Sequence, residues 1–139
     1  MTHDRTAGYA ALILRLASGT AFVTHGFGKL FGMGFGGTAN YFAYLHLPPQ
    51  LAYVVIPLEI LGGIALIIGL HIRTLTVILG TELLVVAVAG HLNLPMHFSM
   101  NGFSWEYPVY WGLSMFALAL LGDGVYSVDN IRFRRKAAA

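Results

Sequence analysis

His25 and Lys29 lie four residues apart in HGFGKL, at the end of a long apolar run. Residues four apart share one face of a helix, so the two side chains should point the same way. An imidazole beside an ammonium can bind carbonyl or hydroxyl oxygens, and the imidazole can exchange a proton with them. The pair therefore predicts a polar site at the end of the first apolar segment.

A second group of polar side chains follows the third apolar segment. That segment ends at His91, and the next residues supply further candidates: His97, Asn101, Trp105, Glu106 and Tyr107. Histidine and glutamate beside aromatic rings can bind the carbonyl and hydroxyl groups of a quinone and exchange protons as it is reduced or oxidised. The sequence therefore predicts one outer polar pocket, formed by His25, Lys29, His91, Glu106 and Tyr107.

Two other interpretations of these side chains stay open. Imidazoles and carboxylates also ligate zinc and copper, and the candidate ligands are His25, His91, His97 and Glu106. Their spacing matches no dedicated metal motif, so a metal is less favoured than a quinone, and haem between His25 and His91 is less favoured still. In the structural alternative, His25 hydrogen-bonds a neighbouring helix and Lys29 contacts a lipid phosphate.

The composition identifies the solvent around these residues. Of 139 residues, 57% are hydrophobic and 10% are charged, and the mean hydropathy is +0.71, far from the balance of a soluble domain. The chain is therefore expected to be an integral membrane protein. Its net charge of +2 argues against nucleic acid as a partner. The absence of cysteine excludes disulfides, thiol relays and cysteine-ligated metals.

Four segments approach the roughly 20 residues that a helix needs to cross a bilayer. They are expected at 9–30, 50–70, 74–92 and 109–122, and the short last one should begin within EYPVYWG or continue past Gly122. The second and third segments are joined at HIRT, a connection so short that it predicts antiparallel neighbours. The expected fold is all-α: one domain over 1–139, a transmembrane four-helix bundle with a short interfacial helix at TANYFAYL in the first outer loop.

Three charged residues fall inside these segments, where a charge costs on the order of 3 kcal/mol or more. At the rise of a helix, Glu59 and Glu82 lie roughly 12 to 13 Å from one end of their segments, near the bilayer midplane. The long side chain of Arg15 can reach either carboxylate. We expect a buried charge network of Arg15, Glu59 and Glu82, either a structural ion pair or a proton-handling site.

Glycines and basic residues predict packing and orientation. Gly28 and Gly32 form GxxxG, and further glycines line the second segment, where small residues let helices approach closely. Lys29 lies on one side of the membrane; the other side carries Arg5, Arg73, Arg132, Arg134, Arg135 and Lys136. By the positive-inside rule both termini are cytoplasmic, and the loops around 31–49 and 93–108 face outward.

Several stretches together resemble the bacterial DoxX family over nearly the whole chain. They are LILRLASGTAFVTHGFGKLFG, GTANYFAYLHLP, PLEILGGIALIIGLHIRT, NGFSWEYP and GDGVYSVD. The resemblance implies a small four-helix membrane protein, often an oxidoreductase component, with relatives among membrane subunits of thiosulfate:quinone oxidoreductases. The disulfide chemistry of the broader group does not transfer, because its cysteines are absent here. Glu82 departs from the mostly apolar third segment expected of the family.

Two functions are consistent with these features. The first is a redox-associated subunit of the bacterial inner membrane, a candidate oxidoreductase component that binds a quinone in the outer pocket. The second is a non-catalytic partner or assembly subunit of a larger complex. Both predict the lipid bilayer and other membrane or redox subunits as partners, and both allow a homo-oligomer.

Overall fold

The computed structural model describes residues 2–91 and 105–131, and every regular element within them is helical. The α-helices are α1 (Thr2–Phe27), α2 (Gly34–Tyr44), α3 (Ala52–Ile68), α4 (Ile72–His91) and α5 (Glu106–Leu121). A π-helical turn, η1 (Gly28–Met33), joins α1 to α2, and a 3-10 turn, η2 (Pro49–Leu51), precedes α3. The all-α class predicted from the sequence is confirmed.

Within residues 2–91 and 105–131, three helical stretches are long and apolar enough to cross a membrane: 5–44, 49–68 and 72–89. Of these, the first combines α1, η1 and α2, and it begins well before residue 9 because α1 continues through the polar start of the chain. Helix α5 has 16 residues, fewer than the roughly 20 needed to cross the bilayer. It begins at Glu106, within the aromatic sequence where its start was expected.

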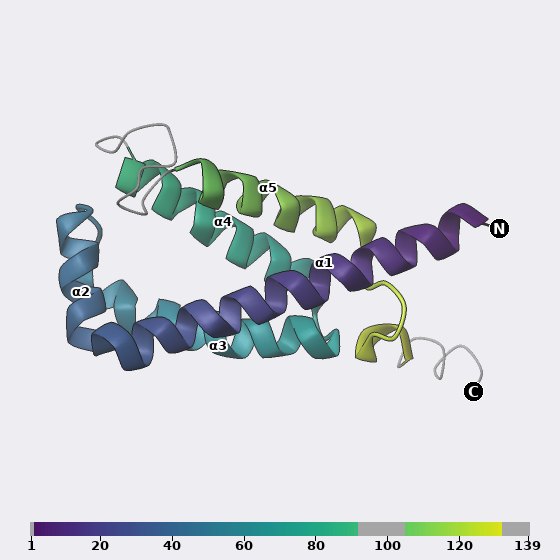
Figure 1. Ribbon diagram of the computed structural model, residues 1–139, viewed down its shortest axis with the longest axis horizontal. Helices are drawn as coiled ribbons and strands as arrows, with labels where there is room; N and C mark the ends of the chain where they lie inside the picture. The colour runs from purple at the N-terminus through teal and green to yellow at the C-terminus, as the bar shows by residue number, and fades with distance from the viewer. Residues whose placement is uncertain (1, 92–104, 132–139) are drawn as a thin grey trace.

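Helices α1 and α3 pack along their length, and so do α4 and α5 (Figure 1). Helix α2 turns away from α1 at one end of the molecule, while the start of α1 and the residues after α5 lie at the opposite end. We refer to these as the α2 end and the terminal end. Helix α2 contains residues 38–44 of the stretch TANYFAYL, so a helix is present there as predicted.

Glycines bring α1 and α3 together, but not the pair that the GxxxG motif suggests. A Cβ atom on Gly19 would lie 2.8 Å from the carbonyl oxygen of Gly63, and one on Gly63 would lie 2.7 Å from the carbonyl oxygen of Gly19. By contrast, no atom lies within 4 Å of the Cβ positions of Gly28 and Gly32. Those two glycines fall in the π-helical turn, beyond the end of the α1–α3 contact, so the predicted packing role at Gly28 and Gly32 is wrong.

Helices α3 and α4 form the expected tight hairpin. Gly69 ends α3 in the left-handed region with φ of 81°, and its N–H donates to the carbonyl of Ala65 at 2.9 Å. This conformation strongly favours glycine, which has no Cβ. The connection fixes α3 and α4 as antiparallel neighbours, so a side chain on α3 can meet one on α4 at the α2 end.

The core and the exterior are both apolar. Phe22, Leu66, Leu79 and Met115 are fully buried, while large hydrophobic side chains such as Leu120, 86% exposed, cover the outer surface. An exterior of this kind is stable in hydrocarbon and not in water. The surroundings of these helices are therefore the lipid bilayer.

Candidate functional site

The centre of the site is a partly buried ion pair between Lys29 and Glu59. The Nζ atom of Lys29 lies 2.6 Å from Oε1 and 2.7 Å from Oε2 of Glu59, so both carboxylate oxygens accept from the ammonium. Glu59 is on α3 and is 2% exposed. The flexible lysine stem allows the ammonium to reach a carboxylate that lies inside the bundle.

Lys29 belongs to η1, the π-helical turn between α1 and α2. Such turns are rare, and they often occur at functional sites because each one shifts the direction of the side chains that follow it. Here the turn lies between α1, which packs on α3, and α2, which leaves the bundle. The local backbone change thus coincides with the residue that carries the buried positive charge.

Glu82 of α4 joins this ion pair. Its carboxyl group faces that of Glu59 closely enough for the two to share a hydrogen bond. Oε2 of Glu82 is buried and has no hydrogen-bond partner among the described residues. Two carboxyl groups and one ammonium from three different helical elements therefore meet at the α2 end, and we call Lys29, Glu59 and Glu82 the charge cluster.

Aromatic rings lie next to the charge cluster. The imidazole of His25 is 6.3 Å from the ring of Tyr107 and 5.4 Å from that of Trp111, between ring centroids. Trp111 also packs on Phe22 of the core, at 4.3 Å. Lys29 is near enough to His25 for their charges to interact. His25 therefore connects the charge cluster with an aromatic wall on α5.

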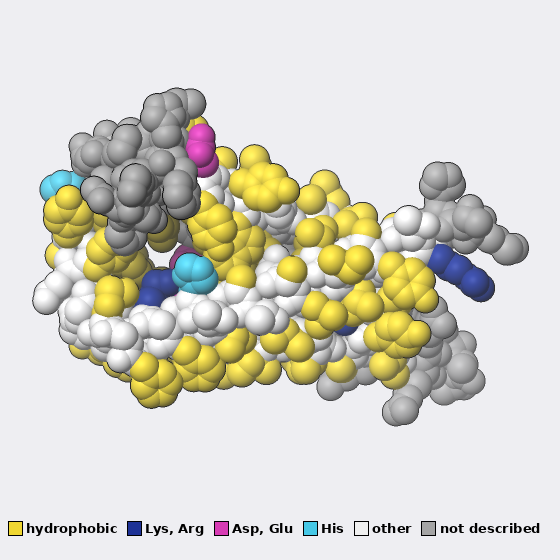
Figure 2. All heavy atoms as spheres, in the orientation of Figure 1, with side chains coloured by type: hydrophobic (Ala, Val, Ile, Leu, Met, Phe, Trp, Pro, Cys, Tyr) yellow, Lys and Arg dark blue, Asp and Glu magenta, His cyan; other side chains and the backbone are white. Residues whose placement is uncertain are grey.

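The charge cluster is accessible from one side of the protein. Figure 2 shows a hollow beside α2, where basic, acidic and histidine side chains meet on a face that is otherwise largely apolar. Lys29 keeps 17% of its side-chain surface, against 3% for Glu59, and His25 and Tyr107 are exposed. A planar ligand that enters the hollow would meet the aromatic rings and the imidazole before the carboxyl groups.

Arg15 lies at the terminal end, and its guanidinium has different partners from those expected. Nη1 donates to the carbonyl of Asp123 at 3.0 Å, and Nη2 donates to the carbonyl of Tyr126 at 3.3 Å. The residue is 1% exposed. Because the side chain extends toward the segment after α5, the cation that binds Glu59 is Lys29 and not Arg15.

The other residues predicted for the outer pocket or a metal site lie at the ends of α4 and α5 or outside the described residues. Glu106 is exposed at the first turn of α5, one residue before Tyr107. His91 is the last residue of α4, and only its backbone is described. His97 and Asn101 lie outside the described residues. Within the described ranges there is no group of three His, Asp or Glu side chains that could hold a metal ion.

Sequence reasoning missed the Lys29–Glu59 pair and the role of Trp111. The available signal for the pair was that Lys29 is the single lysine or arginine assigned to the outer side, and that Glu59 needs a cation. The pairing itself depends on how α1 and α3 are rotated about their axes, which hydropathy does not show. Trp111 was not singled out because one aromatic residue in an apolar helix has no distinguishing pattern.

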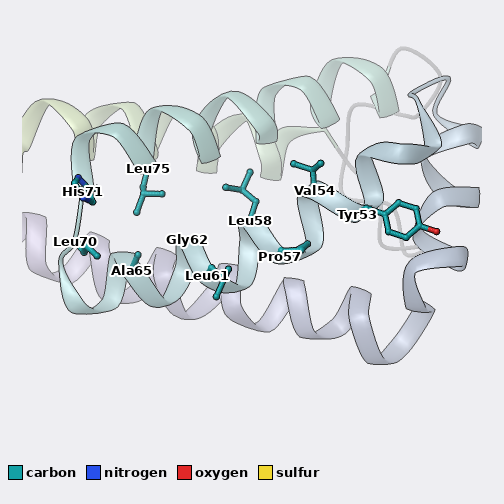
Figure 3. Close-up of a pocket in the computed structure, with 10 residues that line it drawn as sticks. All are labelled: Tyr53, Val54, Pro57, Leu58, Leu61, Gly62, Ala65, Leu70, His71 and Leu75. Carbon is teal, nitrogen blue, oxygen red and sulfur yellow. The ribbon is translucent and has the colours of Figure 1, made fainter.

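A separate apolar cleft lies between α3 and α4, with a volume of about 540 Å³ (Figure 3). Its lining residues are Tyr53, Val54, Pro57, Leu58, Leu61, Gly62, Ala65, Leu70, His71 and Leu75. Tyr53 and His71 lie at opposite ends of the cleft, and the side chains between them are aliphatic. The cleft thus suits a hydrocarbon chain or another apolar helix, whereas polar ligands fit the charge cluster.

Comparisons with known proteins identify related membrane proteins. The DoxX family profile matches residues 10–92. The protein named "Putative oxidoreductase CatD" from Bacillus subtilis (strain 168) is 30% identical over 125 residues, covering 90% of this chain and 88% of CatD. Two Escherichia coli (strain K12) proteins also match: inner membrane protein YqjF, at 29% identity over 86% of this chain and 89% of YqjF, and inner membrane protein YphA, at 33% over 86% and 87%. Comparison with solved structures gives no significant match.

Proposed function

The chain belongs to the DoxX family of membrane proteins, and we propose that it is a redox-associated subunit that binds a quinone head group in the hollow beside the charge cluster. One observation carries this proposal: His25 and the aromatic rings of α5 lie next to a buried ammonium and two carboxyl groups. The flat ring of a quinone can pack on the aromatic rings. Its carbonyl oxygens can accept hydrogen bonds from the site and take up protons from its titratable groups.

The described residues suggest how each part of the ligand is held. The Tyr107 and Trp111 rings provide an apolar surface for the quinone ring, and the His25 imidazole can donate to one carbonyl oxygen. Reduction to a quinol takes up two electrons and two protons. In this proposal the electrons come from a redox-active partner protein, and the protons pass through His25 and the charge cluster. The name of the relative CatD agrees with a redox role.

The membrane arrangement belongs to the same proposal. Helices α1, α3, α4 and α5 form the transmembrane bundle, and α2 lies at the outer interface with its aromatic residues. Arg5 and Arg73 belong to the terminal end, so the positive-inside rule puts that end in the cytoplasm. The hollow then opens at the outer side of the membrane. Two relatives are named as inner membrane proteins, which supports an inner membrane as the location.

A non-catalytic partner or assembly subunit is the second candidate function. The feature that favours it is the apolar cleft between α3 and α4, whose aliphatic lining suits a helix from another membrane protein. In that case the charge cluster has a structural role, and the chain co-purifies in fixed proportion with a larger enzyme without a quinone of its own.

Quinone binding to the purified chain decides between these functions. Lipid extracts of the protein are analysed for bound quinones, and ubiquinone-1 is titrated into detergent-solubilised protein. We expect His25→Leu to weaken ubiquinone-1 binding about tenfold, equivalent to about 1.4 kcal/mol, because a hydrogen-bond donor is lost. His71→Asn, at the far end of the apolar cleft, is the matched control and should bind normally. Absence of ubiquinone-1 binding in the unaltered protein would overturn the quinone proposal.

A further inference from the structure

The charges of the cluster do not balance if both carboxyl groups are ionised. Lys29 supplies one positive charge, while Glu59 and Glu82 would supply two negative charges. Glu59 is 2% exposed, and Oε2 of Glu82 is buried. An uncompensated charge inside a membrane protein is costly and is usually neutralised. One further positive charge is therefore needed at this place.

Hydrogen-bond chemistry identifies that charge as a proton. An ionised carboxylate only accepts hydrogen bonds, so two carboxylates cannot bond each other without a proton between them. Both oxygens of Glu59 already accept from the ammonium of Lys29 at 2.6 and 2.7 Å. Glu59 is thus the ionised partner, and Glu82 is the group that can donate to it.

Two other titratable side chains lie beside the charge cluster. On α1, His25 is near Lys29; on α5, Tyr107 contacts His25; and α3 and α4 contribute the two glutamates themselves. The Arg15 guanidinium lies at the terminal end and is bound to main-chain carbonyls. The described contacts of the charge cluster therefore provide one full positive charge, that of Lys29.

We infer that Glu59 and Glu82 form a one-proton site, in which Glu82 carries the proton and donates it to Glu59. Glu82 then has a free, buried carboxyl oxygen on the side away from that bond. If the quinone proposal holds, on which this consequence rests, Glu82 gives its proton to a quinone oxygen as electrons arrive from the redox partner protein. The resulting unbalanced negative charge favours uptake of the next proton through the hollow, so two such cycles complete one quinol.

Infrared spectroscopy tests the one-proton site without any quinone. The chain has six side-chain carboxyl groups, few enough for a single protonated one to be resolved. At neutral pH, the purified protein should show a carboxylic-acid carbonyl band that shifts in deuterated water. Glu82→Gln, which preserves the shape and neutrality of protonated Glu82, should fold normally and lose the band. Asp129→Asn, at the terminal end, removes a carboxyl group elsewhere and should keep it.

Three results would overturn the inference: no such band in the unaltered protein, a band that persists in Glu82→Gln, or a band that disappears in Asp129→Asn. If Glu82→Gln fails to fold, the pH titration of the band in the unaltered protein still shows whether a carboxyl group is protonated at neutral pH. Sodium is the alternative cation. Stabilisation by sodium chloride over choline chloride at equal ionic strength, with no band, would replace the proton by Na⁺.

The same measurements separate this inference from the quinone proposal. A band that depends on Glu82, together with no binding of ubiquinone-1, supports the one-proton site and rejects the quinone. Binding of ubiquinone-1 without a band rejects the one-proton site and leaves the quinone proposal standing.

Discussion

Helix α1 and the turn that follows it carry two cations inside the fold, the buried Arg15 and the partly buried Lys29, and their hydrogen-bond partners differ. At the α2 end, the Lys29 ammonium meets two carboxyl groups from α3 and α4. At the terminal end, the Arg15 guanidinium meets the main-chain carbonyls of Asp123 and Tyr126. Carboxyl groups gain and lose protons, whereas carbonyls do not. The α2 end is therefore suited to chemistry, and the terminal end to holding the chain in place.

The terminal end is built as a clamp around the segment after α5. A Cβ atom on Gly69 would lie 2.6 Å from Nη1 of Arg15 and 2.5 Å from the Cβ of Ser127. The N–H of Asp129 donates to the carbonyl of Gly69 at 3.1 Å, which ties the same segment to the end of α3. The guanidinium group of Arg15 is planar and has several N–H donors, so one side chain can bind two carbonyls of this segment at once.

The largest expected contrast between the two ends is their accessibility from outside the cell. The chain has no cysteine, so single cysteines can be introduced at Tyr44 of the α2 end, 73% exposed, and at Ile131 of the terminal end, 49% exposed. An impermeant thiol reagent applied to intact cells should label Tyr44→Cys only. Both variants should react after permeabilisation. Labelling of Ile131→Cys alone would reverse the proposed orientation.

Removal of the ammonium should be the most destabilising of the side-chain changes. Lys29→Met leaves Glu59 buried without its cation, and breaking a buried ion pair costs about 3–5 kcal/mol unless the carboxyl group takes up a proton. Denaturant unfolding in detergent measures the loss, and ubiquinone-1 binding should fall with it. Adding Glu59→Gln should recover much of the stability. A double-mutant cycle with no coupling between positions 29 and 59 would contradict the ion pair.

Arg15→Met should cost somewhat less, about 2–3 kcal/mol, and should leave the site intact. The change removes two hydrogen bonds from a charged donor to main-chain carbonyls, together with the attraction between the guanidinium and the carboxylate of Asp123, which is only partly buried. Unfolding in detergent should therefore occur at lower denaturant concentration, while the affinity for ubiquinone-1 stays the same. A loss of ubiquinone-1 affinity in a folded Arg15→Met protein would show that the two ends are not separate in function.

The sequence predicts the helices much better than the site. Hydropathy locates α1, α3 and α4 to within several residues, because lipid requires long apolar helices. The cation that meets Glu59 depends instead on helix rotation and on η1, a π turn with no sequence signature that identifies it. The helix rise puts Arg15 within reach of Glu59, so the sequence favours Arg15 as the cation that binds this carboxylate. The sequence does not show that the segment after α5 supplies carbonyls to the guanidinium instead.

Ser127→Ala is the variant with the smallest expected loss of stability, and it tests how the segment after α5 is held at the terminal end. The hydroxyl of Ser127 accepts a hydrogen bond from the N–H of Asn130 at 3.1 Å and so caps a helical turn at 128–131. Ser127 is fully buried. Loss of a serine cap costs about 1 kcal/mol, so Ser127→Ala should lower the free energy of unfolding by about that amount. Ser114→Ala is the control, because its hydroxyl binds a carbonyl within exposed helix surface at 2.8 Å and caps no helix. Equal losses in both variants would contradict the capping role of Ser127 and leave the contacts of Arg15 and Gly69 as the interactions that hold the segment after α5.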